Sequence, residues 1–420
     1  MNQHFTQLKE FIDEIAVIDT HEHQIEETER LTWNLDFGVL MFVYNNCCLV
    51  SAGMPAEDVS KLISQGGDPV DKWRLLEPYY DFVKHTDYFR SYRYSMEACY
   101  GISDLNEETC VELTRRIMEA NKPGIVRKLI RDKARVDLCI VNSRAEDMFD
   151  EARDRDLFIY EIGFGSLFAP HEYPWKTLQE KSGIALNSFN DLLNIASWFM
   201  EKYSDVAPSI KIQSAYCRTL FFTDPDKNQA IKAFEKFQKN PEEATPETWM
   251  VWQDYLMHHI IRGSIENDLS LRLHTGYLAG NNSMKVYTVN PTLLSDVLIQ
   301  YPEARFSLFH MGYPYQDEMV ALVKHFSNVT ADMCWAWILD ARAAKNFLKQ
   351  CIHAVPVNKI FGFGGDFVMA ESIAGHCRIA REGISMALSE MVDDEILNLQ
   401  DAKMISQRIL RDNPIEYFKL

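Results

Sequence analysis

The chain has 420 residues, 47% of them apolar, which is enough to bury the cores of two average domains or of one large α/β barrel. Aromatic residues make up 12% of the sequence, so an intrinsically disordered chain is excluded. The formal net charge of −18 argues against nucleic acid and anionic membrane surfaces as partners, but an anionic small molecule could still bind in a local cationic pocket.

The nine cysteines are an odd number without a C-x-x-C motif, which is typical of reduced cytoplasmic thiols and not of a disulfide framework. The first residues lack the basic and apolar regions of a signal peptide, and no apolar run reaches the roughly 18 residues of a membrane span. We therefore expect a cytoplasmic protein whose partner is a small-molecule substrate, with no membrane contact. The sequence leaves room for a homo-oligomer.

Apolar runs that suit buried strands alternate with amphipathic helical patterns along the chain. Ser188 begins one such helix, and Asn290 caps another whose first residue is Pro291. The eight predicted strands cover residues 15–18, 136–141, 157–161, 209–212, 270–273, 306–309, 328–332 and 360–363. Eight strands with helices between them predict a (β/α)8 TIM barrel.

Two stretches exceed what such a barrel needs. Residues 24–135 are rich in aromatic and charged side chains but contain no convincing strand, so we expect a long helical insertion after the first strand. A smaller helical insertion is predicted after the fourth strand, at about 219–268. Without repeats or a linker, residues 1–420 are interpreted as a single domain with a helical cap.

A His-x-His motif follows the first predicted strand. Side chains two residues apart in an extended segment point the same way, so His21 and His23 should lie together. Paired imidazoles suit a divalent transition metal. By itself, such a pair is more often two hydrogen-bonded core residues.

Other residues with ligand chemistry lie at the ends of later strands: Lys211 in the fourth, His274 after the fifth, His310 after the sixth and Asp366 after the eighth. Barrel enzymes place their active sites at this end of the strands, so these side chains are expected to converge. The alternatives are a buried hydrogen-bonded histidine for His274 and His310, and a helix cap for Asp366.

The order of these residues resembles the amidohydrolase superfamily of metal-dependent TIM-barrel hydrolases. The local sequences at 211–218, 274–276, 310–315 and 364–367 are similar to an amidohydrolase-related branch. That branch resembles the amidohydrolase half of proteins that also carry a glutamine-synthetase-like half. The resemblance implies an enzyme with a divalent metal at the strand ends.

In this interpretation one ion is held by His21, His23 and Asp366, together with His274, and activates a water molecule. Asp366 would carry the proton, and His310 would polarise a carbonyl or stabilise an oxyanion. Zn²⁺ is the first choice, although the nitrogen and oxygen ligands also admit manganese or iron.

Lys211 has three interpretations: a salt-bridging residue, a carboxylated lysine that bridges two metal ions, or a cation that binds the carboxylate of the substrate. We expect the single-ion form. Arg218 and Tyr216 are candidates to bind that carboxylate, and Arg74 and Trp73 are weaker ones, with a surface ion pair as the alternative for each arginine.

The predicted function is a metal-dependent hydrolase that uses metal-activated water on an amide, lactone or related carbonyl bond of a small, carboxylate-bearing substrate. The alternative is a non-oxidative decarboxylase or a uronate-isomerase-like enzyme on the same scaffold, because the long insertion after the first strand resembles that of uronate isomerases. A non-catalytic binding module would be expected to have lost some of the ligands.

Overall fold

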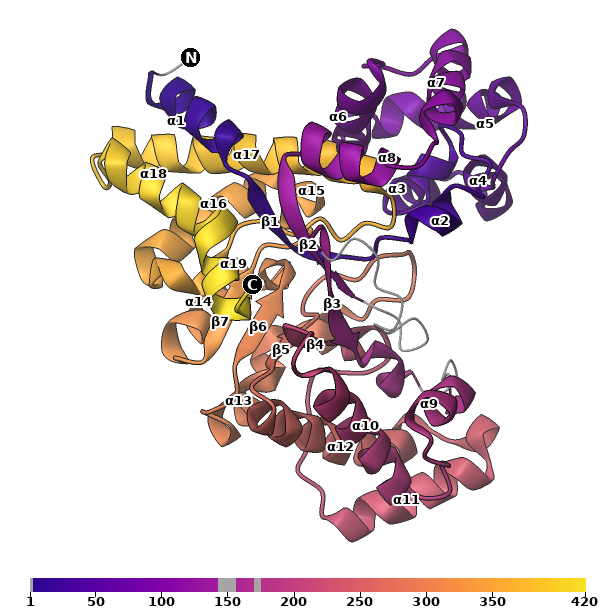
Figure 1. Ribbon diagram of the computed structural model, residues 1–420, viewed down its shortest axis with the longest axis vertical. Coiled ribbons are helices and arrows are strands. Elements are labelled where there is room, and N and C mark those ends of the chain that lie inside the picture. Colours follow the sequence, from indigo (N-terminus) through magenta and orange to yellow (C-terminus); the bar gives the residue numbers. More distant parts are fainter. Residues whose placement is uncertain (1–2, 143–155, 170–174) are drawn as a thin grey trace.

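The computed structural model describes residues 3–142, 156–169 and 175–420. Eight parallel strands lie at its centre, each hydrogen-bonded to the next in chain order (Figure 1). They are β1 (Val17–Glu22), β2 (Val136–Asn142), β3 (Phe158–Gly163), β4 (Ser209–Ile212), β5 (Ser270–Leu273), β6 (Phe306–Phe309), β7 (Val329–Asp332) and β8 (Ile360–Phe361).

The first strand also bonds to the segment at and beyond the last one. The N–H of Thr20 donates to the carbonyl of Phe363 (3.2 Å), and the N–H of Asp366 donates to the carbonyl of His21 (2.8 Å). The sheet therefore curves round on itself, and the predicted (β/α)8 barrel is confirmed.

Helices cover the outside of this barrel and bury its apolar side chains. Outside the insertion that follows β1, they are α1 (Gln3–Glu14), α9 (Trp175–Ser182), α10 (Phe189–Tyr203), α11 (Lys227–Lys239), α12 (Pro246–Glu266), α13 (Ser295–Gln300), α14 (Gln316–His325), α15 (Ala336–Leu339), α16 (Ala341–Ala354), α17 (Ala370–Asp393), α18 (Leu399–Gln407) and α19 (Asn413–Phe418). As predicted, Ser188 caps α10, where its hydroxyl accepts from the N–H of Asp191.

The predicted bounds of β4, β5 and β6 agree with the structure, whereas β1 and β8 differ. β1 begins two residues later than its apolar run and continues through Glu22, so His21 lies inside the strand. Its polar residues stay extended because neighbouring segments bond them: the hydroxyl of Thr20 donates to Asp332 Oδ1 at 3.0 Å. β8 ends at Phe361.

The long insertion after β1 is helical in the structure and has a hydrophobic cluster of its own (Figure 1). Its α-helices are α2 (Glu27–Arg30), α3 (Asn45–Ser51), α4 (Ala56–Ile63), α5 (Pro69–Val83), α6 (Asp87–Tyr100), α7 (Glu107–Ala120) and α8 (Ile125–Arg127). We call residues 24–135 the cap.

The cap is fixed to the barrel mainly through α6 and α17. A Cβ atom on Gly375 of α17 would lie 1.9 Å from the carbonyl oxygen of Ser91, so only glycine permits this approach. Below this contact, the buried carboxylate of Glu371 pairs with Arg30 and accepts from the hydroxyl of Tyr100 (2.7 Å). The cap is therefore held by both packing and a buried ion pair.

The smaller insertion predicted after β4, at about 219–268, is helical in the structure. Its last part forms α12, which leads directly into β5 and is the outer helix that any barrel has between these strands. The additional structure is α11 and the turns around it. α11 buries only Ala230, Phe234 and Phe237, whereas most residues of α12 from Trp252 onward are buried.

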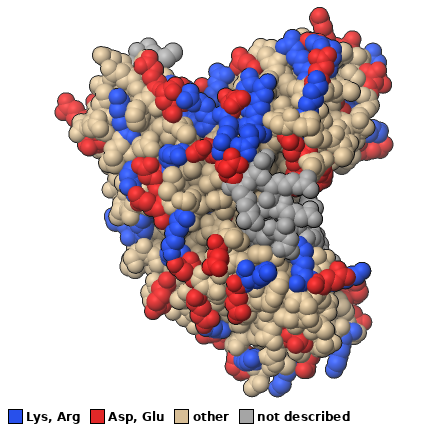
Figure 2. All heavy atoms as spheres, in the orientation of Figure 1, with Lys and Arg blue, Asp and Glu red and all other residues tan. Residues whose placement is uncertain are grey.

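The surface charge is dispersed on the face shown in Figure 2, where acidic and basic side chains are interspersed. Two of the basic side chains are paired as follows: Arg127 of α8 lies 2.8 Å from Asp156, and Arg411 lies 2.9 Å from Asp137. Among the described residues, no helix combines the length and the apolar character needed to cross a membrane.

Candidate active site

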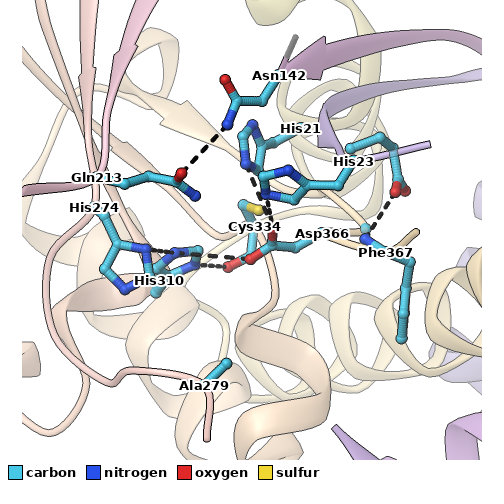
Figure 3. A network of polar contacts seen from close by, with 12 residues as sticks. His21, His23, Asn142, Gln213, His274, Ala279, His310, Cys334, Asp366 and Phe367 are labelled. Carbon is cyan, nitrogen blue, oxygen red and sulfur yellow. Dashed lines mark hydrogen bonds and ion pairs between the residues drawn. The ribbon is translucent and has the colours of Figure 1, made fainter. Parts of the chain in front are cut away.

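Three predicted ligands meet at the carboxyl end of the barrel. Nε2 of His21 lies 3.4 Å from Asp366 Oδ1, and Nε2 of His23 lies 3.1 Å from the same oxygen (Figure 3). His21 is buried at 1% exposure, whereas the side chain of His23 is 29% exposed, so the site is reached from the His23 side. The two imidazole rings are 4.8 Å apart, as the i and i+2 spacing predicts.

The backbone is strained where the strands end at this site. His310, Trp335 and Asp366 adopt positive φ angles of 62°, 62° and 63°, a region that non-glycine residues rarely occupy. Each follows a strand, β6, β7 or β8. Strain of this kind persists only where surrounding contacts enforce it, and it concentrates at functional sites.

A buried carboxylate behind His21 sets the orientation of its ring. Glu161 of β3 accepts from Nδ1 of His21 at 2.9 Å, and its other oxygen pairs with Arg272 of β5 at 2.9 Å. Arg272 in turn pairs with Asp332 of β7 at 3.0 Å. Burial alone would raise the pKa of Glu161, but Arg272 and His21 outweigh it and hold that pKa at about 2.

This arrangement fits a divalent ion. A carboxylate can only accept, so Nδ1 of His21 carries the ring proton and Nε2 presents a lone pair toward Asp366. A lone pair facing a carboxylate oxygen is repulsive unless a cation lies near both. Burial lowers the pKa of His21 to about 3, which keeps the ring in its neutral, ligating form. Histidines that bind metals commonly donate their other N–H to a carboxylate in this way.

Asp366 is an anion in this environment. Burial would raise its pKa, but the contacts with His23, His21 and His310 hold it well below the usual range. The hydroxyl of Tyr44, a cap residue, donates to the carbonyl of Asp366 at 2.6 Å. The cap therefore takes part in holding the loop that carries the carboxylate.

Two acidic residues of β1 support the same loop. Asp19 accepts from the N–H of Gly365 at 3.0 Å, and Glu22 accepts from the N–H of Phe367 at 2.8 Å. Burial raises the pKa of Glu22 well above its usual value and that of Asp19 to about 6. The two carboxyl groups interact, and the charge of Asp19 adds to the effect of burial on the pKa of Glu22.

His274 and His310 also lie at the site, but in an arrangement the sequence did not predict. Nδ1 of His310 faces the carbonyl of Cys334 at 2.8 Å, and Nε2 of His274 faces the carbonyl of Tyr277 at 2.8 Å. Both of these nitrogens must therefore carry protons, because carbonyls only accept. The remaining nitrogens, His310 Nε2 and His274 Nδ1, face each other at 3.0 Å.

His310 was predicted to polarise a carbonyl or stabilise an oxyanion, which requires an N–H that points into the site. A neutral His310 has no N–H on Nε2 with which to polarise a carbonyl, and burial lowers its pKa to about 4. Its Nε2 lies 3.9 Å from Asp366 Oδ2. The geometry suits a metal ligand better than a donor to an oxyanion.

Lys211 is fully buried beside the site, and its Nζ has no hydrogen-bond partner among the described residues. It lies 4.2 Å from the centre of the Phe309 ring. Burial lowers the pKa of Lys211 to about 8, against the opposing charges of Glu161 and Asp366. No carboxylate of the described residues lies within salt-bridge distance of it, so the structure gives no support to the salt-bridging interpretation.

The four predicted substrate-binding residues are placed differently. Tyr216 reaches the site, where its ring packs edge-on against His274 with centroids 4.8 Å apart. Arg218 is not brought there: its guanidinium is buried 2.5 Å from Asp254, a long-range partner that the sequence could not reveal. Arg74 is exposed on the cap surface beside Asp71, and Trp73 is buried in the cap cluster.

Sequence reasoning missed Glu161, Arg272, Asp332 and Tyr44. A signal existed for the first three, since each is a charged residue within or at the end of an otherwise apolar strand. Such a residue must find a buried partner, because an isolated charge in a barrel core is too costly. Tyr44 gave no comparable signal, because its position depends on how the cap folds over the barrel.

Comparisons with known proteins agree with this description. Residues 231–420 match the family model described as amidohydrolase. The protein FluG of Emericella nidulans is 24% identical over 205 residues, which are 47% of this chain but only 23% of that protein.

Two solved structures share the whole fold. Glucuronate isomerase of Caulobacter crescentus has a TM-score of 0.81 at 17% identity, covering 99% of this chain and 94% of its own. Uronate isomerase of Thermotoga maritima has a TM-score of 0.80 at 15% identity, covering 100% and 98%. At such identities the likeness establishes the fold alone. The amidohydrolase family model is therefore matched by the C-terminal part of the chain, and the two structures share the (β/α)8 fold of the chain as a whole.

Proposed function

We propose that the protein is a metal-dependent hydrolase acting on an amide, lactone or related carbonyl bond of a small substrate that bears a carboxylate. The observation that carries the proposal is the convergence of His21 Nε2 and His23 Nε2 on Asp366 Oδ1 at the carboxyl end of the barrel. The amidohydrolase match over residues 231–420 supports it.

A divalent ion held by His21, His23 and Asp366 would supply Lewis acidity, which lowers the pKa of bound water to about 7 and polarises a carbonyl oxygen. Asp366 accepts a proton from the attacking water and returns it to the leaving group. Its carboxylate lies beside the His21 and His23 nitrogens that would hold the ion, so it is within reach of a water bound there. The bonds from Tyr44 and Asp19 to its loop hold that carboxylate in place.

Lys211 is the cation proposed to bind the carboxylate of the substrate, or the oxyanion that develops on its carbonyl. It is buried beside Asp366 without a hydrogen-bond partner in the described part of the chain, so a substrate oxygen could become that partner. Arg218 is not proposed for this role, because Asp254 and the carbonyl of Phe221 already engage its guanidinium.

A second candidate is an aldose–ketose isomerase acting on a uronic acid. The observation in its favour is that the likeness to two uronate isomerases extends over nearly the entire chain, the cap included. The metal ligands would be the same. The two reactions differ in the proton they move: hydrolysis takes one from water, whereas isomerisation moves one between adjacent carbons.

Isotopes separate the two candidates. The Zn²⁺-reconstituted protein would be given N-acyl amino acids, lactones of hydroxy acids and uronic acids, in water enriched in ¹⁸O or in D₂O. Hydrolysis is expected to place one ¹⁸O in the released carboxylate and no deuterium on carbon. Turnover of uronic acids alone, with deuterium next to the product carbonyl, would replace the hydrolase proposal by the isomerase.

The variant Asp366→Asn tests the proton carrier. We expect it to retain most of its metal but to lose kcat by roughly 10²–10⁴-fold, the usual contribution of a general acid–base group. Asp205→Asn, at an exposed aspartate outside the site, is the matched control and should leave kcat unchanged. Near-normal turnover by metal-replete Asp366→Asn would show that another residue carries the proton.

A further inference from the structure

The carboxylate of Asp366 faces metal-ligating side chains on two sides. Its Oδ1 faces the His21 and His23 pair, while Oδ2 faces His310 Nε2 at 3.9 Å (Figure 3). On this second side, the ligand atoms of His310, Cys334 and Asp366 all lie within 4.8 Å of one another. All three residues are buried and follow the neighbouring strands β6, β7 and β8.

The imidazoles of His310 and His274 face each other on this side. The outer nitrogens of His310 and His274 are bonded to the carbonyls of Cys334 and Tyr277, and their inner nitrogens lie 3.0 Å apart. With both outer nitrogens donating, this short contact needs a cation at the inner nitrogens, either an added proton or a metal ion. This contact does not involve the thiol, and a metal ion bound to His310 Nε2 is one of the two arrangements that satisfy it.

Cys334 is held firmly at this position. Its N–H donates to Asp332 Oδ1 at 2.9 Å, and its carbonyl accepts from His310. A Cβ atom on Gly364 would lie 3.0 Å from the Cys334 sulfur and 2.8 Å from its Cβ, so the ends of β7 and β8 are closely packed here. The thiol is therefore placed beside His310 and Asp366 by the fold itself.

We propose that His310, Cys334 and Asp366 form a second metal position, which shares Asp366 with the His21 and His23 position and takes a thiophilic divalent ion such as Zn²⁺, Co²⁺ or Cd²⁺. Sulfur, nitrogen and carboxylate oxygen together are a donor set typical of zinc, with metal–sulfur distances of about 2.3 Å and metal–nitrogen distances of about 2.0 Å. As the metal–sulfur bond forms, the thiol proton is released to solvent. This position does not depend on carboxylation of Lys211.

Cobalt provides a readout other than activity, because a thiolate bound to Co²⁺ gives a charge-transfer absorption in the near ultraviolet. Metal-free protein would be titrated with Co²⁺, and bound cobalt counted by elemental analysis. The wild type is expected to bind about two equivalents and to show the band. Cys334→Ser should lose the band and keep about one equivalent. The matched control Cys351→Ser removes a buried thiol of α16 and should behave like the wild type.

The double variant His21→Ala with His23→Ala separates this inference from the proposed function, since the two share only Asp366. It should bind one equivalent of Co²⁺ and keep the band. Unchanged cobalt content in that variant would count against the His21 and His23 position while leaving the thiol position standing. A band that survives in Cys334→Ser, or in Cys334→Ala as a second substitution, would overturn the inference. So would a double variant that keeps the wild-type circular dichroism spectrum but has no band.

Discussion

Glu161→Gln is the perturbation whose effects can be worked out most fully from the structure. The carboxylate of Glu161 is completely buried and joins three groups: His21 at 2.9 Å, Arg272 at 2.9 Å and the hydroxyl of Ser209 at 2.8 Å. Glutamine preserves the shape but removes the charge. Among the described residues, Asp332 is then the ion-pair partner that Arg272 keeps.

Two lines of reasoning give the cost in stability. Removing one partner of a buried ion pair typically costs about 3–5 kcal/mol. The pKa of Glu161 falls from 4.5 to about 2 on folding, and at 1.36 kcal/mol per unit this corresponds to roughly 3 kcal/mol at neutral pH. We therefore expect the free energy of unfolding of metal-free Glu161→Gln to fall by about 3 kcal/mol.

The same substitution should weaken metal binding. Without the carboxylate, Nδ1 of His21 is less firmly oriented, and the loss of such a supporting group costs about 10–100-fold in metal affinity. Urea unfolding of the metal-free protein measures the first effect, and a competitive Zn²⁺ titration measures the second. Ser209→Ala, which removes only the hydroxyl bonded to Glu161, should cost about 0.5–1.5 kcal/mol and leave the affinity unchanged.

The two readouts can fail separately. If the stability of Glu161→Gln equals that of the wild type, the buried ion pair does not stabilise the barrel as reasoned here. If stability falls while Zn²⁺ affinity stays the same, Glu161 holds Arg272 but does not orient His21.

Two further predictions concern titration. Metal content should not depend on bicarbonate during reconstitution at pH 7. The pKa of about 8 keeps most Lys211 as an ammonium, which does not react with carbon dioxide. A bicarbonate-dependent rise in metal content that is absent from Lys211→Gln would show that Lys211 is carboxylated. Metal-free protein should lose stability as pH falls below about 6.5. Burial lowers the pKa of His21 to about 3 and that of His310 to about 4. In this pH range the unfolded chain therefore binds more protons than the folded one. Each histidine then contributes up to roughly 1.4 kcal/mol per pH unit, and a urea midpoint that stays constant between pH 7.5 and pH 5 would contradict this sign.

The sequence by itself determined the barrel and the first group of ligands. Strands β4, β5 and β6 could be placed because each is a short, mainly apolar run bounded by polar turns, and this pattern is visible in the local sequence. His21 and His23 could be paired because strand geometry fixes the direction of alternate side chains. Asp366 could be added because parallel strands end on one side of a barrel.

Contacts between distant residues were decided only by the tertiary structure. From the sequence, Arg218 was expected to bind the carboxylate of the substrate. In the structure it is paired instead with Asp254, a buried partner 36 residues away. Glu161 and Arg272 are 111 residues apart, and no local pattern indicates that they meet. Which nitrogen of His310 carries the proton depends on a carbonyl after another strand, that of Cys334. Periodicity encodes which face of an element is buried, whereas the partner of each buried polar group is fixed only when the barrel closes and the cap packs against it.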